Sequence, residues 1–161
     1  MIEKIILGAG CFWGVEDLFR QVLGIVSTCV GYSGGFLENP SYEDVCNGRS
    51  GHTEVIEIKY DTTQISLQEI LNLFWDNHNP TYKNKAQYKS VIFYFTPEQK
   101  NLAENLKEQL AKSQKYNNEI RTDILPAQTF YKAEEYHQKY YEKQKIKFEK
   151  YLSICKVDLT D

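Results

Sequence analysis

The stretch GAGCFWGVEDLF, residues 8–19, decides how the N-terminal part of the chain folds. The apolar run at residues 4–7 predicts a strand, and apolar residues then recur at helical spacing as far as Leu23, with Gly24 well placed to end the helix. Cys11 therefore falls where the strand gives way to the helix. Free N–H groups and the helix dipole favour a thiolate there, so we expect Cys11 to have a lowered pKa and to be nucleophilic.

Cys11 also has a simpler interpretation, because a free cysteine at such a junction is often just a small buried residue. Its neighbours argue for chemistry. Gly10 and Gly14 let the backbone turn tightly and let another molecule approach, while Phe12 and Trp13 offer an apolar surface beside the sulfur.

Composition limits the other possibilities. The 161 residues suit a single domain, 1–161, and 19 Lys+Arg against 22 Asp+Glu leave a net charge of −3 without a basic block, so we expect no nucleic acid and no membrane as partner. The N-terminus lacks the pattern of a signal peptide, which predicts a cytoplasmic location. The cysteines lie far apart and are Cys11, Cys29, Cys46 and Cys155. Because no C-x-x-C pair occurs, we expect reduced thiols rather than a zinc ribbon or a disulfide framework.

The rest of the chain alternates strands and helices. Strands are predicted at residues 25–30, 53–60, 90–95 and 120–125, and helices after the caps Ser66 and Thr96 and through residues 133–148. Residues 31–51 form a long loop of the kind that is usually functional, and residues 142–161 are predicted to be a mobile C-terminal tail. This order predicts an α+β, two-layer sandwich with a ferredoxin-like βαββαβ core and an extended C-terminal segment.

A carboxylate is the second chemical feature. Glu54 shares one face of its strand with Ile56 and Ile58, so we expect it to be buried, to keep its proton to a higher pH and to act as a general acid. The simpler alternative is an edge-strand glutamate that bends out to solvent. In the preceding loop, the hydroxyl of Tyr42 can orient or protonate a polar substrate atom.

The histidines suggest less. His52, His78 and His137 are isolated and lack metal-ligand spacing, so we expect them to cap turns, pack on rings or face solvent. A Cys-His hydrolase would need one of them beside Cys11, which the sequence leaves open.

Six segments, in order, resemble the A-type peptide-methionine sulfoxide reductases over residues 6–141: GCFWGVEDLF, VGYSGG, SYEDVCNGRSGHTEVIEIKYD, LFWDNHNPT, QYKSVIFY and TFYKAEEYHQKYY. The resemblance implies reduction of the S epimer of methionine sulfoxide, free or in proteins, to methionine. It implies a cysteine sulfenic acid that becomes a disulfide, which thioredoxin or another thiol reduces. It also implies no metal or organic cofactor, and we expect a monomer.

The resemblance carries over site residues by position. Cys11 would attack the sulfoxide sulfur, while Phe12 and Trp13 enclose the methyl group on it. Glu54 would protonate the oxygen, assisted by the hydroxyls of Tyr42 and Tyr88.

Two departures from the family pattern matter. Only YKNKA separates Thr81 from Gln87, so a family aspartate that helps to hold a catalytic water has no counterpart, and Lys89 replaces an arginine. We predict a shortened loop, with any water-holding role passed to other groups. At the C-terminus, Cys155 is the candidate resolving thiol, although an external thiol, Cys46 or Cys29 can take that step instead.

Two other functions fit parts of the pattern. A peroxidatic or peroxide-sensing protein also needs a reactive cysteine and a resolving partner, but it does not account for the Phe12–Trp13 surface or for Glu54. A module that binds oxidised methionine without turnover would result if the short loop had disabled the chemistry.

Overall fold

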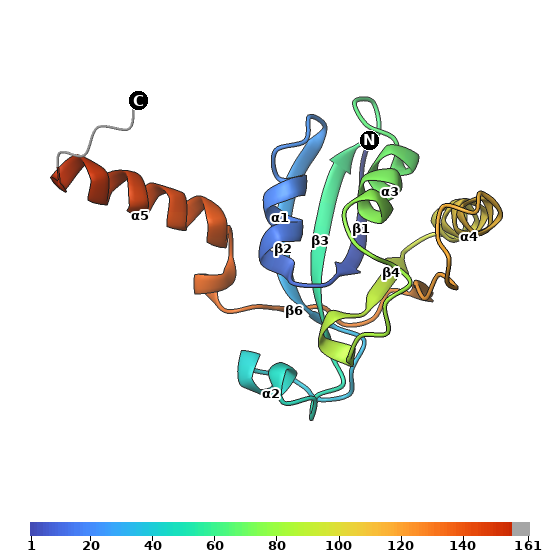
Figure 1. Cartoon of the computed structure of the whole chain (residues 1–161), viewed down its shortest axis with the longest axis horizontal. Coiled ribbons are helices and arrows are strands. Elements are labelled where there is room, and N and C mark those ends of the chain that lie inside the picture. Colours follow the sequence, from blue (N-terminus) through green and yellow to red (C-terminus); the bar gives the residue numbers. More distant parts are fainter. Residues whose placement is uncertain (156–161) are drawn as a thin grey trace.

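The structure, a computed structural model, describes residues 1–155, apart from the side chains of Tyr151 and residues 153–155. One six-stranded sheet carries helices and long connections (Figure 1). Its strands are β1 (Ile2–Ala9), β2 (Ile25–Ser33), β3 (Thr53–Asp61), β4 (Ser90–Tyr94), β5 (Asp123–Pro126) and β6 (Tyr131–Lys132). The helices are α1 (Phe12–Phe19), α2 (Tyr42–Cys46), α3 (Leu67–Asp76), α4 (Pro97–Lys112) and α5 (Tyr140–Cys155), with 3₁₀ turns η1 (Ala86–Tyr88) and η2 (Glu135–His137).

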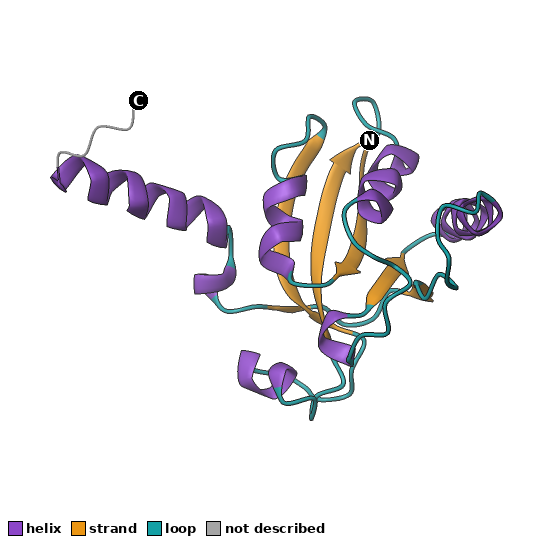
Figure 2. Ribbon diagram, viewed as in Figure 1, coloured by secondary structure: helices purple, strands orange, loops and turns teal. Residues whose placement is uncertain are grey.

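The strands lie in the order β5-β4-β1-β3-β2-β6. Neighbours from β4 to β6 are antiparallel, and only β5 runs parallel to its neighbour, β4. Helices and strands are mixed, so the predicted α+β class is confirmed (Figure 2). After α1 the chain returns as β2 beside β3, and after α3 it returns as β4 beside β1.

Both faces of the sheet are buried, because side chains alternate along each strand. On one face Ile5 and Leu7 pack opposite Ile58 and Ile56 and join the core beneath α1, α3 and α4. On the other face a smaller core is covered by the segment that follows β5; its members are Ile6, Val55, Val91 and Phe93, with Leu125, Ala127 and Phe130 packed against them. The expected burial of the Ile56 face is thus confirmed, and the opposite face is buried as well.

The predicted caps are present. Ser66 Oγ accepts a hydrogen bond of 3.1 Å from the backbone N–H of Glu69 at the start of α3. Thr96 does the same for Gln99 at the start of α4, where Pro97 takes the first helical position. These short side chains satisfy N–H groups that a helix start leaves free.

Two helix boundaries differ from the prediction. Helix α1 ends at Phe19, and Leu23, expected on its apolar face, is 84 % exposed, because turns lead into Gly24 at φ 99°. The last helix begins at Tyr140 and not at residue 133. Before it the chain is irregular: the Gln138 side-chain amide donates to the backbone carbonyls of Val30 and Ala133. Lys139 has a φ of 51°, a conformation that interrupts a helix.

The loop predicted at residues 31–51 covers residues 34–52 in the structure, because β2 continues to Ser33. It contains α2, which starts with a capping box between Ser41 and Asp44. His52 crosses the loop, with Nδ1 accepting from the N–H of Gly35 and Nε2 within 2.7 Å of the Leu37 carbonyl. This histidine has the structural role that the sequence predicted.

Helix α5 extends away from the sheet (Figure 1). Its first residues lie against α1, where the rings of Tyr140 and Trp13 stack at 3.7 Å. Residues 142–155 of the predicted tail are therefore helical, while residues 156–161 lie outside the described residues. None of the described helices is long and apolar enough to cross a membrane.

Candidate active site

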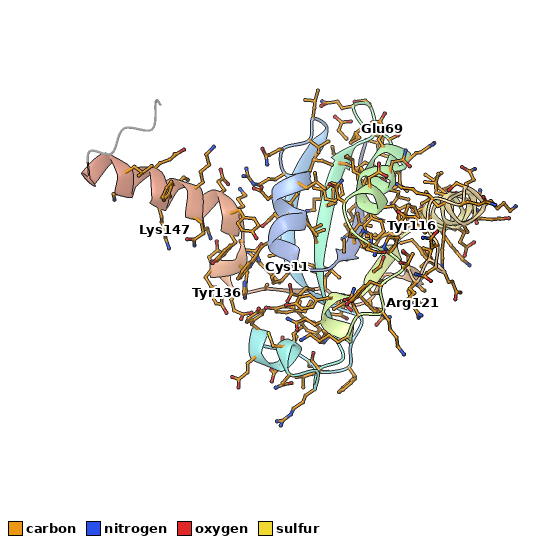
Figure 3. All side chains as sticks on the ribbon, in the orientation of Figure 1. Cys11, Glu69, Tyr116, Arg121, Tyr136 and Lys147 are labelled. Carbon is orange, nitrogen blue, oxygen red and sulfur yellow. The ribbon has the colours of Figure 1, made fainter. Side chains whose placement is uncertain are left out.

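Cys11 caps the N-terminus of α1, as predicted, and is exposed (Figure 3). The chain reaches it through Gly10, whose φ of 88° is a conformation that suits glycine. Gly14 has no such requirement, and a Cβ there would come no closer than 3.9 Å to the Tyr141 ring. Gly10 is thus needed for the turn, whereas Gly14 leaves the surface beside the sulfur open.

The expected lowering of the Cys11 pKa is wrong. Loss of solvent raises the pKa of the Cys11 thiol, and the negative charge of Glu54 raises it further. The backbone N–H groups of Trp13 and Gly14 act in the opposite direction, as a helix N-terminus should, but they do not prevail. Desolvation is the main cause of the raised pKa, and the neighbouring carboxylate, which sequence alone could not place beside the sulfur, adds to it.

Glu54 lies on β3 with 1 % of its surface exposed, so its predicted burial is confirmed. One carboxylate oxygen, Oε1, accepts the backbone N–H of Phe12 at 3.2 Å, and the other, Oε2, lies 2.7 Å from Nε2 of Gln87. Burial raises the pKa of Glu54, while these two hydrogen bonds and Lys85 oppose the shift. A carboxyl that holds its proton to higher pH therefore sits against the residue next to Cys11.

Gln87 belongs to the site, although the sequence did not indicate a role for it. It is 2 % exposed in η1, and its Nε2 lies 3.3 Å from Sγ of Cys46 as well as close to Glu54. The only signal was its place in the QYKS segment, next to Tyr88.

The two predicted tyrosines come from different segments and meet beside Glu54. Tyr42 opens α2 and Tyr88 ends η1, and a hydrogen bond with the Tyr42 hydroxyl lowers the pKa of Tyr88. Desolvation and the charges of Glu54 and Cys11 outweigh it and raise the Tyr88 pKa. The pKa of Tyr42 is raised chiefly by its hydrogen bond to the Cys46 thiol. Both phenols therefore keep their protons at neutral pH and can donate hydrogen bonds.

Phe12 and Trp13 form an aromatic wall next to Cys11. The Phe12 ring is buried and lies 5.1 Å from the His137 ring, while Trp13 is half-buried and donates its indole N–H to Nδ1 of His137 at 2.9 Å. Burial lowers the pKa of His137, so the ring is neutral. His137 supports the wall, and among the described residues no histidine forms a hydrogen bond with Cys11.

A thiol, an acid with a raised pKa, two phenols and an aromatic wall thus share one site, and related proteins identify it. A family model of peptide methionine sulfoxide reductase matches residues 3–160. The chain belongs to this family. It is 52 % identical over 147 residues to the peptide methionine sulfoxide reductase MsrA of Methanothermobacter thermautotrophicus, covering 88 % of this chain and 87 % of the relative.

Solved structures of methionine sulfoxide reductases have a similar fold. Methionine sulfoxide reductase A of Corynebacterium diphtheriae matches with a TM-score of 0.77 and 36 % identity, covering 88 % of this chain and 74 % of that one. Mxr1 from Saccharomyces cerevisiae in reduced form matches with a TM-score of 0.82 and 34 % identity, covering 88 % and 85 %. This protein is therefore an oxidoreductase that uses a thiol to reduce methionine sulfoxide.

The C-terminal segment of the reductase completes the site. Glu134 accepts the hydroxyl of Tyr32 at 3.0 Å and the backbone N–H of Tyr42 at 3.1 Å, so it ties α2 to the sheet. Tyr136 also donates to Glu134, and its ring lies 4.1 Å from the His137 ring. The sequence placed these residues in a helix, and their role depends on the irregular path before α5.

Lysines lie in and beside the predicted short loop between Thr81 and Gln87. Lys85 lies over the Tyr88 ring at 5.3 Å and lowers the pKa of Glu54, while Lys89 pairs with Asp123 at 3.2 Å. Lys89 thus binds the edge strand β5 and is not directed at Glu54.

The cysteines other than Cys11 are in different surroundings. Cys46 ends α2 and contacts Gln87 and Tyr42 of the site, whereas Cys29 lies on β2 near Lys132. The backbone of Cys155 ends α5, and its side chain lies outside the described residues. Within the described part of the chain, no group of three or more His, Cys, Asp or Glu side chains is placed to hold a metal ion.

Proposed function

We propose that the reductase acts on the S epimer of methionine sulfoxide, free or in proteins, with Cys11 as nucleophile and Glu54 as acid. The observation that carries the proposal is the hydrogen bond from the Phe12 N–H to Glu54, which fixes a proton-holding carboxyl next to the exposed cysteine. The Cys11 thiolate attacks the sulfoxide sulfur while Glu54 protonates the oxygen. The bond between the methionine sulfur and the protonated oxygen then breaks, the oxygen passes to the Cys11 sulfur as a sulfenic acid, and methionine leaves.

Phe12 and Trp13 are proposed to enclose the methyl group of the sulfoxide. The two rings form an apolar surface. The orientation of the Trp13 indole is fixed, because its N–H group donates to His137 and the Tyr140 ring stacks on the indole. A sulfoxide presents a methyl group and a polar oxygen on the same sulfur, so a ring wall beside a proton donor can distinguish two epimers.

Tyr42 and Tyr88 are proposed to bind the sulfoxide oxygen as it gains negative charge. Their raised pKa values support this, since a phenol must keep its proton to donate a hydrogen bond. With Glu54 they also supply polar groups that replace the absent aspartate in holding a water.

The Cys11 sulfenic acid is proposed to condense with the Cys155 thiol, giving a disulfide and water, after which thioredoxin or another thiol reduces the disulfide. Mxr1 of S. cerevisiae has been solved in complex with Trx2, which supports a thioredoxin partner. Tryptic mass spectrometry after one turnover tests the pairing: a peptide linked from Cys11 to Cys155 is expected, and a link from Cys11 to Cys46 or Cys29 would contradict it.

We also propose that the sheet is built on a ferredoxin-like core. The order β4-β1-β3-β2, with α1 and α3 as connections, supports a ferredoxin-like core, to which β5 and β6 are added. We further propose a single domain, a monomer, a cytoplasmic location and no metal or organic cofactor.

One assay separates this function from its alternatives. Reduced protein is incubated with each epimer of methionine sulfoxide and with hydrogen peroxide, and methionine released per protein is counted. We expect turnover on the S epimer and none in a Cys11→Ser variant. Peroxide consumption alone would indicate a peroxidatic thiol, and binding without methionine release would indicate a recognition module.

A further inference from the structure

Gln87 has an unusual hydrogen-bonding position in the site. Its Nε2 lies 2.7 Å from Oε2 of Glu54 and 3.3 Å from Sγ of Cys46, so one end of the amide faces two ionisable groups. Its other end, Oε1, is buried and has no hydrogen-bond partner in the part of the chain that the structure describes. A buried amide oxygen without a partner costs free energy, which calls for a functional reason.

The two charge states of Glu54 need opposite partners. An ionised carboxylate only accepts hydrogen bonds, and the Gln87 N–H group supplies one. A protonated carboxyl carries an O–H group at that oxygen and needs an acceptor. The thiol of Cys46 is likewise a weak donor when protonated and an acceptor when ionised.

A half-turn of the amide provides both partners. The oxygen and nitrogen of a glutamine amide have nearly the same shape, so rotation exchanges them without moving the rest of the side chain. After rotation, Oε1 would face the protonated Glu54 and the Cys46 thiol. The unpartnered Oε1 position then holds the N–H₂ group, so each orientation matches one protonation state of Glu54.

We propose that Gln87 is a positioning residue that holds Glu54 both before and after proton transfer, by turning its side-chain amide over as Glu54 changes charge. This inference rests on the proposed role of Glu54 as the acid. Before substrate binds, Oε1 of Gln87 accepts from the Glu54 O–H group, and this O–H group then turns from Gln87 to the sulfoxide oxygen to deliver its proton. After the proton has passed from Glu54 to the sulfoxide oxygen, Nε2 of Gln87 donates to the new carboxylate.

Other groups near Glu54 do not supply this exchange. The titratable residues that face Glu54 or its Gln87 contact are Cys11, Tyr32, Tyr42, Cys46, Lys85 and Tyr88. Tyr32 is engaged by Glu134, and Lys85 can only donate. The hydroxyls of Tyr42 and Tyr88 can donate or accept, but the hydrogen bonds that the described structure gives the Glu54 carboxylate come from the Phe12 N–H and Gln87. The Phe12 N–H is a donor in either state, so of these two partners Gln87 is the one that can change from donor to acceptor.

The test is NMR on the reduced protein, which needs no substrate. The side-chain N–H₂ resonances of Gln87 are assigned by their loss in Gln87→Met and followed with pH beside the ¹³C carboxyl signal of Glu54. We expect both to move with one midpoint, and the Gln87 signals to stay still in Glu54→Gln. Static Gln87 signals during the Glu54 titration would overturn the inference, as would the same movement in Glu54→Gln.

Activity provides a second measurement. Gln87→Met should lower the rate of methionine formation in a single turnover about tenfold, because a hydrogen bond to a charged group is lost. The exposed Gln64, whose amide lies 3.5 Å from Asp61, provides the control Gln64→Met, which should leave that rate unchanged. An inactive wild type would contradict the proposed function, whereas a normal rate in Gln87→Met would contradict the Gln87 inference alone.

Discussion

The indole N–H of Trp13 donates a 2.9 Å hydrogen bond to Nδ1 of His137, 124 residues further along the chain. Because Nδ1 accepts, the imidazole must be neutral with its proton on Nε2, in agreement with its lowered pKa. The ring also packs against Phe12 and Tyr42. One buried histidine therefore fixes the aromatic wall to the segment that carries Glu134.

His137→Phe should weaken substrate binding. The substitution keeps a ring against Phe12 but removes the acceptor of the Trp13 indole, whose orientation is then less fixed. We expect KM for methionine sulfoxide to rise about tenfold, which corresponds to one hydrogen bond, with a smaller change in kcat. Steady-state kinetics on the S epimer measure both.

The second tryptophan provides the control for His137→Phe. Trp75 donates its indole N–H to Oγ1 of Thr122 at 3.0 Å, away from Cys11. Thr122→Val removes this bond and the 2.7 Å bond between the Thr122 and Ser90 hydroxyls, so it should lower the free energy of unfolding by roughly 1–3 kcal/mol and leave KM unchanged. A KM that is unchanged in His137→Phe would show that the wall does not need the indole hydrogen bond.

Glu54→Gln should slow the first turnover by about 10²- to 10⁴-fold, the usual contribution of a general acid. In the wild type, the reactive form carries a Cys11 thiolate beside a protonated Glu54, so the rate should pass through a maximum with pH: the small thiolate fraction limits it at low pH, and loss of the Glu54 proton limits it at high pH. The variant has no acid to lose, so its rate should rise to a plateau without falling. Rapid-quench measurements of methionine across pH give both profiles.

Glu57→Gln is the matched control for Glu54→Gln, because Glu57 lies on the same strand with the opposite side-chain direction. Its rate and pH profile should equal those of the wild type. If Glu54→Gln slowed the reaction no more than Glu57→Gln does, the acid would have to be another group.

Much of the fold followed from local sequence patterns. The caps Ser66 and Thr96 and the alternation through Ile56 and Ile58 are short-range signals, and the structure has the elements they predict. The end of α1 was misjudged because Leu23 continues a helical spacing that the turn at Gly24 overrides. Apolar spacing reports what a helix could bury, but not where tertiary packing ends it.

The site was also only partly predictable, because sequence patterns report contacts between neighbouring residues better than contacts across the fold. The burial of Glu54 follows from strand alternation, a property of neighbouring residues. The raised pKa of Cys11 depends on desolvation by the surrounding fold and on the charge of Glu54, and the roles of Gln87 and His137 depend on contacts at long range. Such pairings are set by topology, so a single sequence can suggest the groups without showing their electrostatic balance.

Gly35→Ala should destabilise the loop that carries α2. A Cβ at Gly35 would lie 2.3 Å from the carbonyl oxygen of Ser50 and 2.4 Å from the backbone nitrogen of His52. Backbone atoms cannot move aside cheaply, so we expect a loss of about 1–3 kcal/mol in the free energy of unfolding, measured by urea denaturation.

Gly14→Ala is the matched glycine substitution for Gly35→Ala. The nearest atom to its new Cβ, in the Tyr141 ring, is 3.9 Å away, and the residue lies within α1. Alanine in a helix is favoured over glycine by about 1 kcal/mol, so this variant should be more stable than the wild type. Equal losses in both variants would mean that the close contacts at Gly35 do not decide the outcome.

The electrostatic link between Cys11 and Glu54 predicts how fast Cys11 is alkylated. The Glu54 charge raises the pKa of Cys11, and Glu54 is ionised at the alkaline pH where thiols titrate. Removing that charge in Glu54→Gln should therefore lower the pKa of Cys11, so the midpoint of its reaction with iodoacetamide moves to lower pH. A Cys11 midpoint that stays fixed would show that the carboxylate does not set the reactivity of the thiol.

Cys29 is an internal control for this measurement. The charges that act on the Cys29 thiol do not include Glu54; they are those of Lys132, Glu57, Glu16 and Glu135. The Cys29 midpoint should therefore not move in Glu54→Gln, and a Cys11 midpoint that moved together with it would also contradict the link.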